Sequence, residues 1–129
     1  MNFYTVNFVE SVEPQHYRAS VTLEPEHPVF AGHFPGNPIL PGVCSLQMVV
    51  GCAEKALGYP VVMIHAPAIK FLEIVRPASG EELVIDFHVN DDFLLKAVIV
   101  SGKRTVMSCK AKLERKIFFA ENQTYRKKC

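Results

Sequence analysis

Apolar and polar residues alternate along several stretches of this chain, with the period of two that a β-strand with one buried face requires. In the clearest stretch, residues 82–89, a large apolar residue stands at every second position. The pattern predicts strands over residues 1–9, 16–23, 61–65, 68–75, 82–89, 93–100 and 104–113. Short turns join the last three, so an antiparallel meander is expected there, with Thr105, Met107 and Cys109 facing inward.

One stretch has the period of a helix instead. Residues 42–57, GVCSLQMVVGCAEKAL, would carry apolar side chains around most of a helix, and Gly58 can adopt the left-handed conformation that ends one. We therefore expect this helix to be buried on several sides, and Gln47 to need hydrogen-bond partners in the core. A sheet of about five to six strands curled around one long helix is an α+β architecture, here as a single domain over residues 1–129.

The segment before this helix, GHFPGNPILPGV, carries three evenly spaced prolines. Each proline fixes its own φ and favours an extended residue before it, so the segment should be a stiff arc that holds His33 in place. Gly42 then opens the helix, where backbone N–H groups are unpaired and lie at the positive end of the helix dipole. A base candidate and an oxyanion-binding candidate thus lie close together. A rigid connector without chemistry explains the same prolines.

Bulk composition limits the class of protein. The chain has 129 residues, 49% of them hydrophobic, and a formal net charge of +1, which suits one domain with a sizeable core and does not suggest a nucleic-acid partner. No apolar run is long enough to cross a bilayer, and the N-terminus lacks the features of a signal peptide, so we expect a cytoplasmic protein. Residues 114–129 form a basic tail, in which residues 117–119 could make a last edge strand before a disordered end.

Cysteine and histidine spacing predicts neither a disulfide framework nor a metal site. Cys44 and Cys52 lie about 12 Å apart along the predicted helix, too far for a disulfide, and Cys109 and Cys129 complete the set. The histidines show no ligand spacing, and no metal or redox cofactor is expected. A thiol near a helix start can have a lowered pKa, so Cys44 as the nucleophile of a Cys–His hydrolase is an alternative, although no third residue is placed to orient the histidine.

The segment GHFPGNPILPGV followed by a buried helix resembles the active-site signature of the bacterial 3-hydroxyacyl-acyl-carrier-protein dehydratases of the hot-dog fold. A later segment, AIKFLEIVRPASGEELVIDFHV, is similar to the second half of the same family, and the similarity covers residues 28–113. The resemblance implies the hot-dog fold and the removal of water from a 3-hydroxyacyl thioester to give the trans-2-enoyl thioester.

The resemblance also implies roles for single residues. His33 falls on the catalytic histidine, the base that removes the α-proton, and Gly42 falls on the glycine whose N–H polarises the thioester carbonyl. Gln47 stands where the family has a glutamate or aspartate that assists departure of the hydroxyl. An amide has no proton to give at neutral pH, so general-acid help, typically worth about 10²- to 10⁴-fold, would be lost. The acyl chain is expected in an apolar channel lined by Phe34, Pro41, Val43, Leu46 and Val50.

Three functions remain open. The first is a dehydratase, or a hydratase in reverse, in which Gln47 orients the hydroxyl or a water. The second is a non-catalytic or partner-dependent acyl-binding subunit, paired with another hot-dog chain that supplies the carboxylate. The third is an acyl thioesterase that uses the same pocket. Each would take an acyl thioester linked to acyl carrier protein or coenzyme A, at an interface in a homodimer, a higher oligomer of such dimers or a heterodimer.

Overall fold

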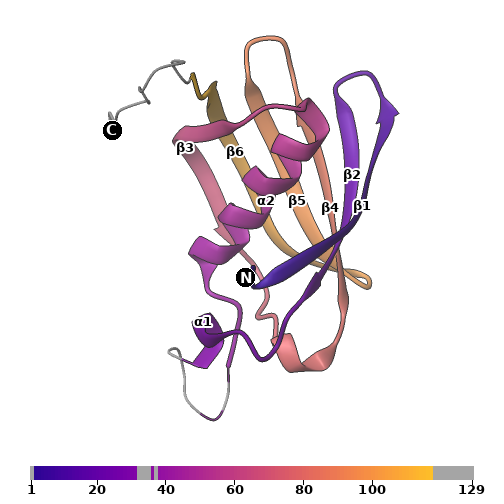
Figure 1. Ribbon diagram of the computed structural model, residues 1–129, viewed down its shortest axis with the longest axis vertical. Helices are drawn as coiled ribbons and strands as arrows, with labels where there is room; N and C mark the ends of the chain where they lie inside the picture. The colour runs from indigo at the N-terminus through magenta and orange to yellow at the C-terminus, as the bar shows by residue number, and fades with distance from the viewer. Residues whose placement is uncertain (1, 32–35, 37, 118–129) are drawn as a thin grey trace.

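The computed structural model describes residues 2–31, 36 and 38–117, and Figure 1 shows their arrangement. Within these residues, six strands form one antiparallel sheet: β1 (Tyr4–Glu13), β2 (His16–Leu23), β3 (Val61–Phe71), β4 (Glu82–Val89), β5 (Leu94–Ser101) and β6 (Arg104–Arg115). The long helix is α2 (Gly42–Leu57). Two short segments, α1 (Pro28–Ala31) and the 3-10 turn η1 (Pro77–Ser79), lie in the connections.

The order of the strands follows from the path of the chain through α2. In space the order is β1-β2-β4-β5-β6-β3, so β3 lies at one edge of the sheet although it comes third in the chain. After β2 the chain leaves the sheet, runs through α2 across one face, and returns at the opposite edge (Figure 1). The sheet curls around that helix, which agrees with the predicted α+β architecture.

The core lies between α2 and the face of the sheet that it crosses. In β4, Leu83, Ile85 and Phe87 are fully buried, as their alternation predicted. They meet a helix face whose buried residues follow helical spacing: Cys44, Ser45, Met48, Val49, Cys52 and Ala53. Each large apolar side chain buried in this way contributes roughly 1.5–3 kcal/mol, so the seam between helix and sheet is the main source of stability.

The predicted bounds of β1 and β3 were wrong. β1 continues to Glu13 instead of ending at residue 9, because β2 pairs with it as far as His16. β3 runs through Pro67 as one strand instead of two, with irregular register on either side of His65. Proline is tolerated here because an edge strand has one side on which no N–H donor is needed. The residues after Phe71, predicted as strand, lie outside it.

The alternation of inward-facing and outward-facing residues in β6 is shifted by one residue near the start of the strand. Thr105, predicted to face inward, is exposed, whereas Val106 is buried. Val100 pairs with Thr105 and Ile99 pairs with Met107, so Val106 is an extra residue in a β-bulge. A period-two pattern cannot signal an inserted residue, and beyond Met107 the predicted alternation is confirmed.

The C-terminal prediction concerns few described residues. Residues 114–115 extend β6, and Ile117 is exposed outside any strand, while residues 118–129 lie outside the described ranges. The prediction of a last edge strand therefore falls mostly on residues that the structure does not describe, and that of one domain over residues 1–129 stays a prediction. In the described ranges, no helix has the length and apolar character needed to span a membrane.

We expect Leu83→Ala to lower the free energy of unfolding by about 2–5 kcal/mol, because Leu83 is fully buried between β4 and α2. The matched control is Leu94→Ala on the neighbouring strand, since Leu94 is half exposed. That change should cost less than about 1 kcal/mol. Urea unfolding followed by circular dichroism measures both, and equal losses would contradict this assignment of the core.

Candidate active site at the start of helix α2

The start of α2 has backbone donors that find no partner among the described residues. Pro41 is extended, and its carbonyl accepts hydrogen bonds from the N–H groups of Cys44 (3.0 Å) and Ser45 (3.2 Å). No hydrogen bond joins the N–H of Gly42 or of Val43 to another described residue. These two donors lie at the positive end of a helix of 16 residues, so a developing negative charge would be stabilised beside them.

An apolar cavity of about 280 Å³ adjoins Gly42. The ring of Phe71, at the end of β3, approaches Gly42 so closely that a Cβ at this position would lie 2.7 Å from the ring. Phe71 and Ile74 are both about half exposed at the rim, which is unusual for large apolar residues in a single chain. A larger residue at position 42 would therefore have to displace the Phe71 ring, a close approach that the sequence did not reveal.

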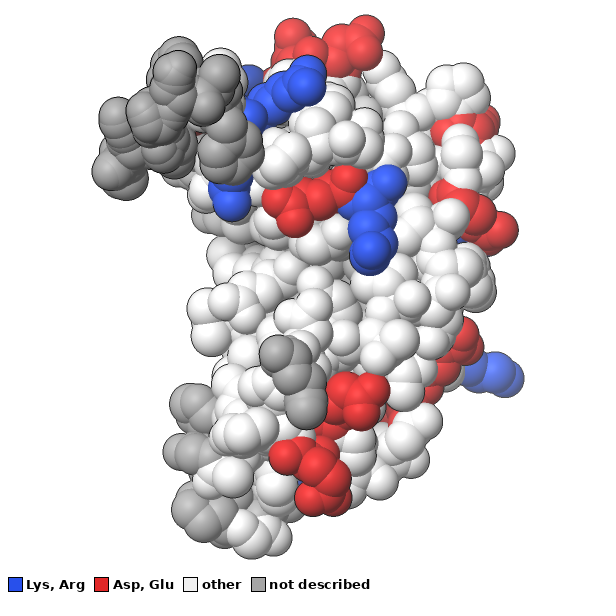
Figure 2. Space-filling view, viewed as in Figure 1, with Lys and Arg blue, Asp and Glu red and all other residues white. Residues whose placement is uncertain are grey.

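A second side of α2, which carries Val43, Leu46 and Val50, is apolar and is not fully covered by the described residues. Val43 is 64% exposed and Leu46 and Val50 are partly exposed, so the expectation that α2 is buried on several sides is wrong for the single chain. Gln47 is also exposed, not buried in the core, and its amide has no hydrogen-bond partner among the described residues. Figure 2 shows this side of the molecule, where uncharged side chains occupy the middle of the surface.

A groove of about 480 Å³ runs between this side of α2 and the start of β3. Three of the predicted channel residues, Val43, Leu46 and Val50, line it together with Gln47. The structure thus brings these four together, whereas Gly42 opens on the separate cavity beside Phe71.

Tyr4 is a groove residue that sequence reasoning missed. A Cβ at Gly51 would lie 2.1 Å from the Tyr4 hydroxyl, so the glycine leaves room for the phenol. A glycine inside a helix lowers helix stability by about 1 kcal/mol relative to alanine. Its presence at position 51 was therefore the available signal that another group approaches the helix closely there. Burial, followed by the charges of Cys52 and Glu54, raises the pKa of the Tyr4 hydroxyl. Glu54 itself accepts a hydrogen bond from the Val61 N–H at 3.0 Å and so fixes the start of β3.

The two remaining site predictions, His33 and Phe34, lie outside the described residues. The cysteine alternative can be judged, because Cys44 is buried and burial raises the pKa of its thiol. A nucleophilic cysteine needs a lowered pKa and access to substrate, and Cys44 has neither. The interpretation of Cys44 as a hydrolase nucleophile is therefore wrong.

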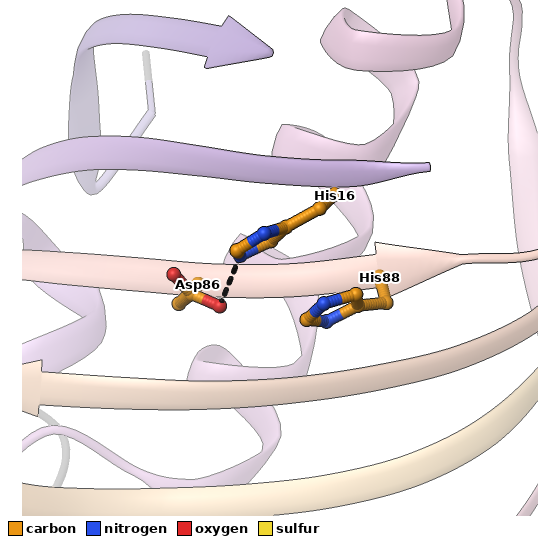
Figure 3. A group of neighbouring side chains, drawn as sticks. All are labelled: His16, Asp86 and His88. Atoms are coloured by element: carbon orange, nitrogen blue, oxygen red, sulfur yellow. Dashed lines mark hydrogen bonds and ion pairs between the residues drawn. The ribbon is translucent and has the colours of Figure 1, made fainter. Parts of the chain in front are cut away.

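His16, Asp86 and His88 form a polar cluster on the face of the sheet turned away from α2 (Figure 3). His16 Nε2 lies 2.8 Å from Asp86 Oδ1, and the rings of His16 and His88 stack with centroids 4.0 Å apart. Their possible ligand atoms all lie within 4.8 Å of one another, and two ligands of one zinc ion lie at most about 4.2 Å apart. The expectation that no metal is required stays a prediction.

Comparison with known proteins supports the assignment of the fold. The structure superposes on a chain of the dehydratase heterocomplex ApeI:P from Xenorhabdus doucetiae with a TM-score of 0.74 at 24% identity, covering 84% of this chain and 96% of that one. Thioesterase superfamily member 2 from Mus musculus gives a TM-score of 0.59 at 14% identity, with coverages of 88% and 81%. At these identities the likeness is one of fold, and the fold is the hot-dog fold.

Sequence comparison is more specific. The model of the ApeI-like family, described as ApeI dehydratase, matches residues 9–119. The 3-hydroxyacyl-[acyl-carrier-protein] dehydratase FabZ of Lactobacillus helveticus (strain DPC 4571) is 28% identical over 137 residues, which cover 96% of this chain and 84% of that relative. The chain belongs to the ApeI-like dehydratase family.

The buried thiol of Cys52 should make stability fall at alkaline pH. Burial, slightly offset by the Lys55 ammonium, raises the pKa of this thiol from 9.0 to about 12. Between these values the unfolded chain loses a proton that the native protein keeps, so stability falls as pH rises, by at most about 1.4 kcal/mol per pH unit. Urea unfolding across this range should show a steeper decline for the native sequence than for Cys52→Ala. Parallel declines would show that the thiol is not buried in its neutral form.

Proposed function

We propose that the protein removes water from a 3-hydroxyacyl thioester, linked to acyl carrier protein or coenzyme A, and adds water in the reverse direction. Membership of a dehydratase family supports the class of reaction. The observation that carries the proposal is the start of α2, where the N–H groups of Gly42 and Val43 have no described partner and an apolar cavity adjoins them. An enolate-like transition state needs donors of this kind where its charge develops.

In the proposed reaction the thioester carbonyl oxygen binds at the N–H of Gly42, and His33 takes the proton from the α-carbon. The electron pair of that C–H bond forms the new double bond as the β-carbon to oxygen bond breaks. The departing hydroxide needs a proton to leave as water. The amide of Gln47 cannot supply it, so the proton taken by His33 must be returned to the hydroxyl, or an acid of a second chain must provide one.

A second hot-dog chain would complete the site. β3 is an edge strand with one open side, and Val62 and Ile64 on it are exposed, as is Val43 on α2. An open strand edge beside an uncovered apolar helix face is suited to pairing with another chain, because both the backbone groups and the apolar surface would be satisfied. This surface supports the proposal of pairing in a homodimer, a larger assembly of dimers or a heterodimer, and a dehydratase-like partner could carry the carboxylate that Gln47 replaces.

We expect Gln47→Glu to raise the rate of hydration of a crotonyl thioester by about 10²-fold, since it restores a carboxyl where the family has one. His33→Ala should abolish the activity of both the native sequence and the Gln47→Glu variant. The assay follows loss of enoyl absorbance with the purified protein, and in parallel the release of free thiol, which a thioesterase would produce.

Gln47→Met is the matched control, because it keeps the length of the side chain and carries neither amide nor acid. If Gln47→Glu and Gln47→Met have the same rate, the carboxyl argument is wrong. Activity that survives His33→Ala would refute the role of the histidine. Activity that arises only on mixing with a second hot-dog chain would identify the protein as the partner-dependent subunit instead.

We expect Gly42→Ala to lower kcat by about 10²- to 10³-fold, as when one oxyanion donor is lost, because the methyl group would keep the substrate oxygen away from the N–H that alanine retains. The added methyl group would occupy space that the substrate oxygen needs, and it would also meet the ring of Phe71. The double variant Gly42→Ala with Phe71→Ala separates these effects, because it removes the ring. Activity should stay low in the double variant while its circular dichroism spectrum stays native. Recovery of activity would show that the glycine only makes room for Phe71.

A further inference from the structure

The face of the sheet turned away from α2 carries a second pocket, of about 630 Å³. This volume lies within the usual range of small-molecule sites, about 300–1,000 Å³. Its walls combine apolar groups, among them Pro14, Pro67 and Leu94, with three lysines, Lys96, Lys110 and Lys112. Among the described residues no aspartate or glutamate lines it, although acidic and basic residues are nearly equal in number over the whole chain, 13 against 14.

The strand register explains how the charges come together. His88 on β4 pairs with Lys96 on β5, and Lys96 pairs with Lys110 on β6. The stacked pair of His16 and His88 in Figure 3 extends the same row onto β2. Inward-facing neighbours such as Ala97 are buried, so the row lies on the outer face of the sheet. Basic side chains thus cross four adjacent strands side by side.

This arrangement is unfavourable for the isolated sheet. Like charges directly opposite each other on adjacent strands destabilise a sheet, and Lys96 and Lys110 are such a pair. The side-chain ammonium group of neither lysine forms an ion pair or a hydrogen bond with a described residue, whereas the ammonium group of Lys112 donates a hydrogen bond to the Asp92 carbonyl. Two unpaired ammonium groups at the mouth of a pocket are suited to a ligand that brings negative charge.

We propose that this pocket binds a small organic phosphate, with the phosphate between Lys96 and Lys110 and an apolar body against Pro67 and Leu94. A second copy of the chain is the less suitable occupant, because two such faces would bring their lysines together. The site lies on the opposite face of the sheet from α2, so its ligand is distinct from the thioester at Gly42. The inference does not depend on the proposed reaction.

The test is a titration of the full chain followed by backbone amide NMR shifts, with adenosine monophosphate as the probe. Adenosine provides the ring without charge, and inorganic phosphate provides the charge without the ring. We expect adenosine monophosphate to shift the amides of β4, β5 and β6 around Lys96 and Lys110, phosphate to shift them more weakly, and adenosine to have no effect. Added salt should weaken the binding because it screens the charges.

The double variant Lys96→Gln with Lys110→Gln should weaken binding of adenosine monophosphate at least about tenfold, the loss expected for one charged hydrogen bond. The control, Lys55→Gln with Lys103→Gln, removes the same charge from exposed lysines outside the pocket and should leave affinity unchanged. The pocket variant should unfold at no lower a temperature than the native sequence, because it relieves a repulsive pair.

Several results would overturn the proposal. Equal weakening in the two double variants would show binding to net charge alone. Binding of adenosine as tight as that of its monophosphate would show that the lysines are not used, and shifts confined to other strands would place the ligand elsewhere. Dissociation of an oligomer on substitution of Lys96 and Lys110, measured by light scattering, would show that the face is an interface between copies.

Discussion

The contact between α2 and the curled sheet is the constraint on which the rest of the molecule depends. One side of the helix supplies buried residues of different sizes, from Ala53 to Met48, that fit against the fully buried row of β4. That contact fixes the direction of the helix and hence the place of its N-terminal N–H groups. It also determines which side of the helix stays uncovered. The catalytic proposal and the proposed pairing of chains are therefore both consequences of one packing seam.

The uncovered side of α2 explains why a single chain looks incomplete. Val43 and Gln47 are exposed on a helix that the sequence marked as apolar nearly all round. The hydrophobic pattern was correct about composition, but it could not tell burial against the chain's own sheet from burial against another chain. The helix is less buried in the single chain than its sequence predicts. This difference indicates a partner chain, because apolar surface of this kind is costly to leave in water.

Much of the architecture could be predicted from the sequence because the alternation in β4 and the length of α2 are strong periodic signals. Two of the misplaced positions share one cause: Pro67 and Val106 stand where a strand departs from regular pairing, and the departure depends on a partner strand that is distant in sequence. The candidate site was less predictable for the same reason. Phe71 approaches Gly42, and Tyr4 approaches Gly51, only when β3 and β1 are in place. A glycine in the sequence does not indicate which residue will approach it.

The position of β3 at the sheet edge has a consequence for biosynthesis. Its only partner in the described sheet is β6, which begins at Arg104, some 33 residues after β3 ends at Phe71. A nascent chain leaving the ribosome therefore presents β3 before the strand that pairs with it has been made. Long-range pairing of this kind slows folding and leaves apolar segments open to misassembly. Until β6 has been synthesised, β3 has no strand of the described sheet with which to pair.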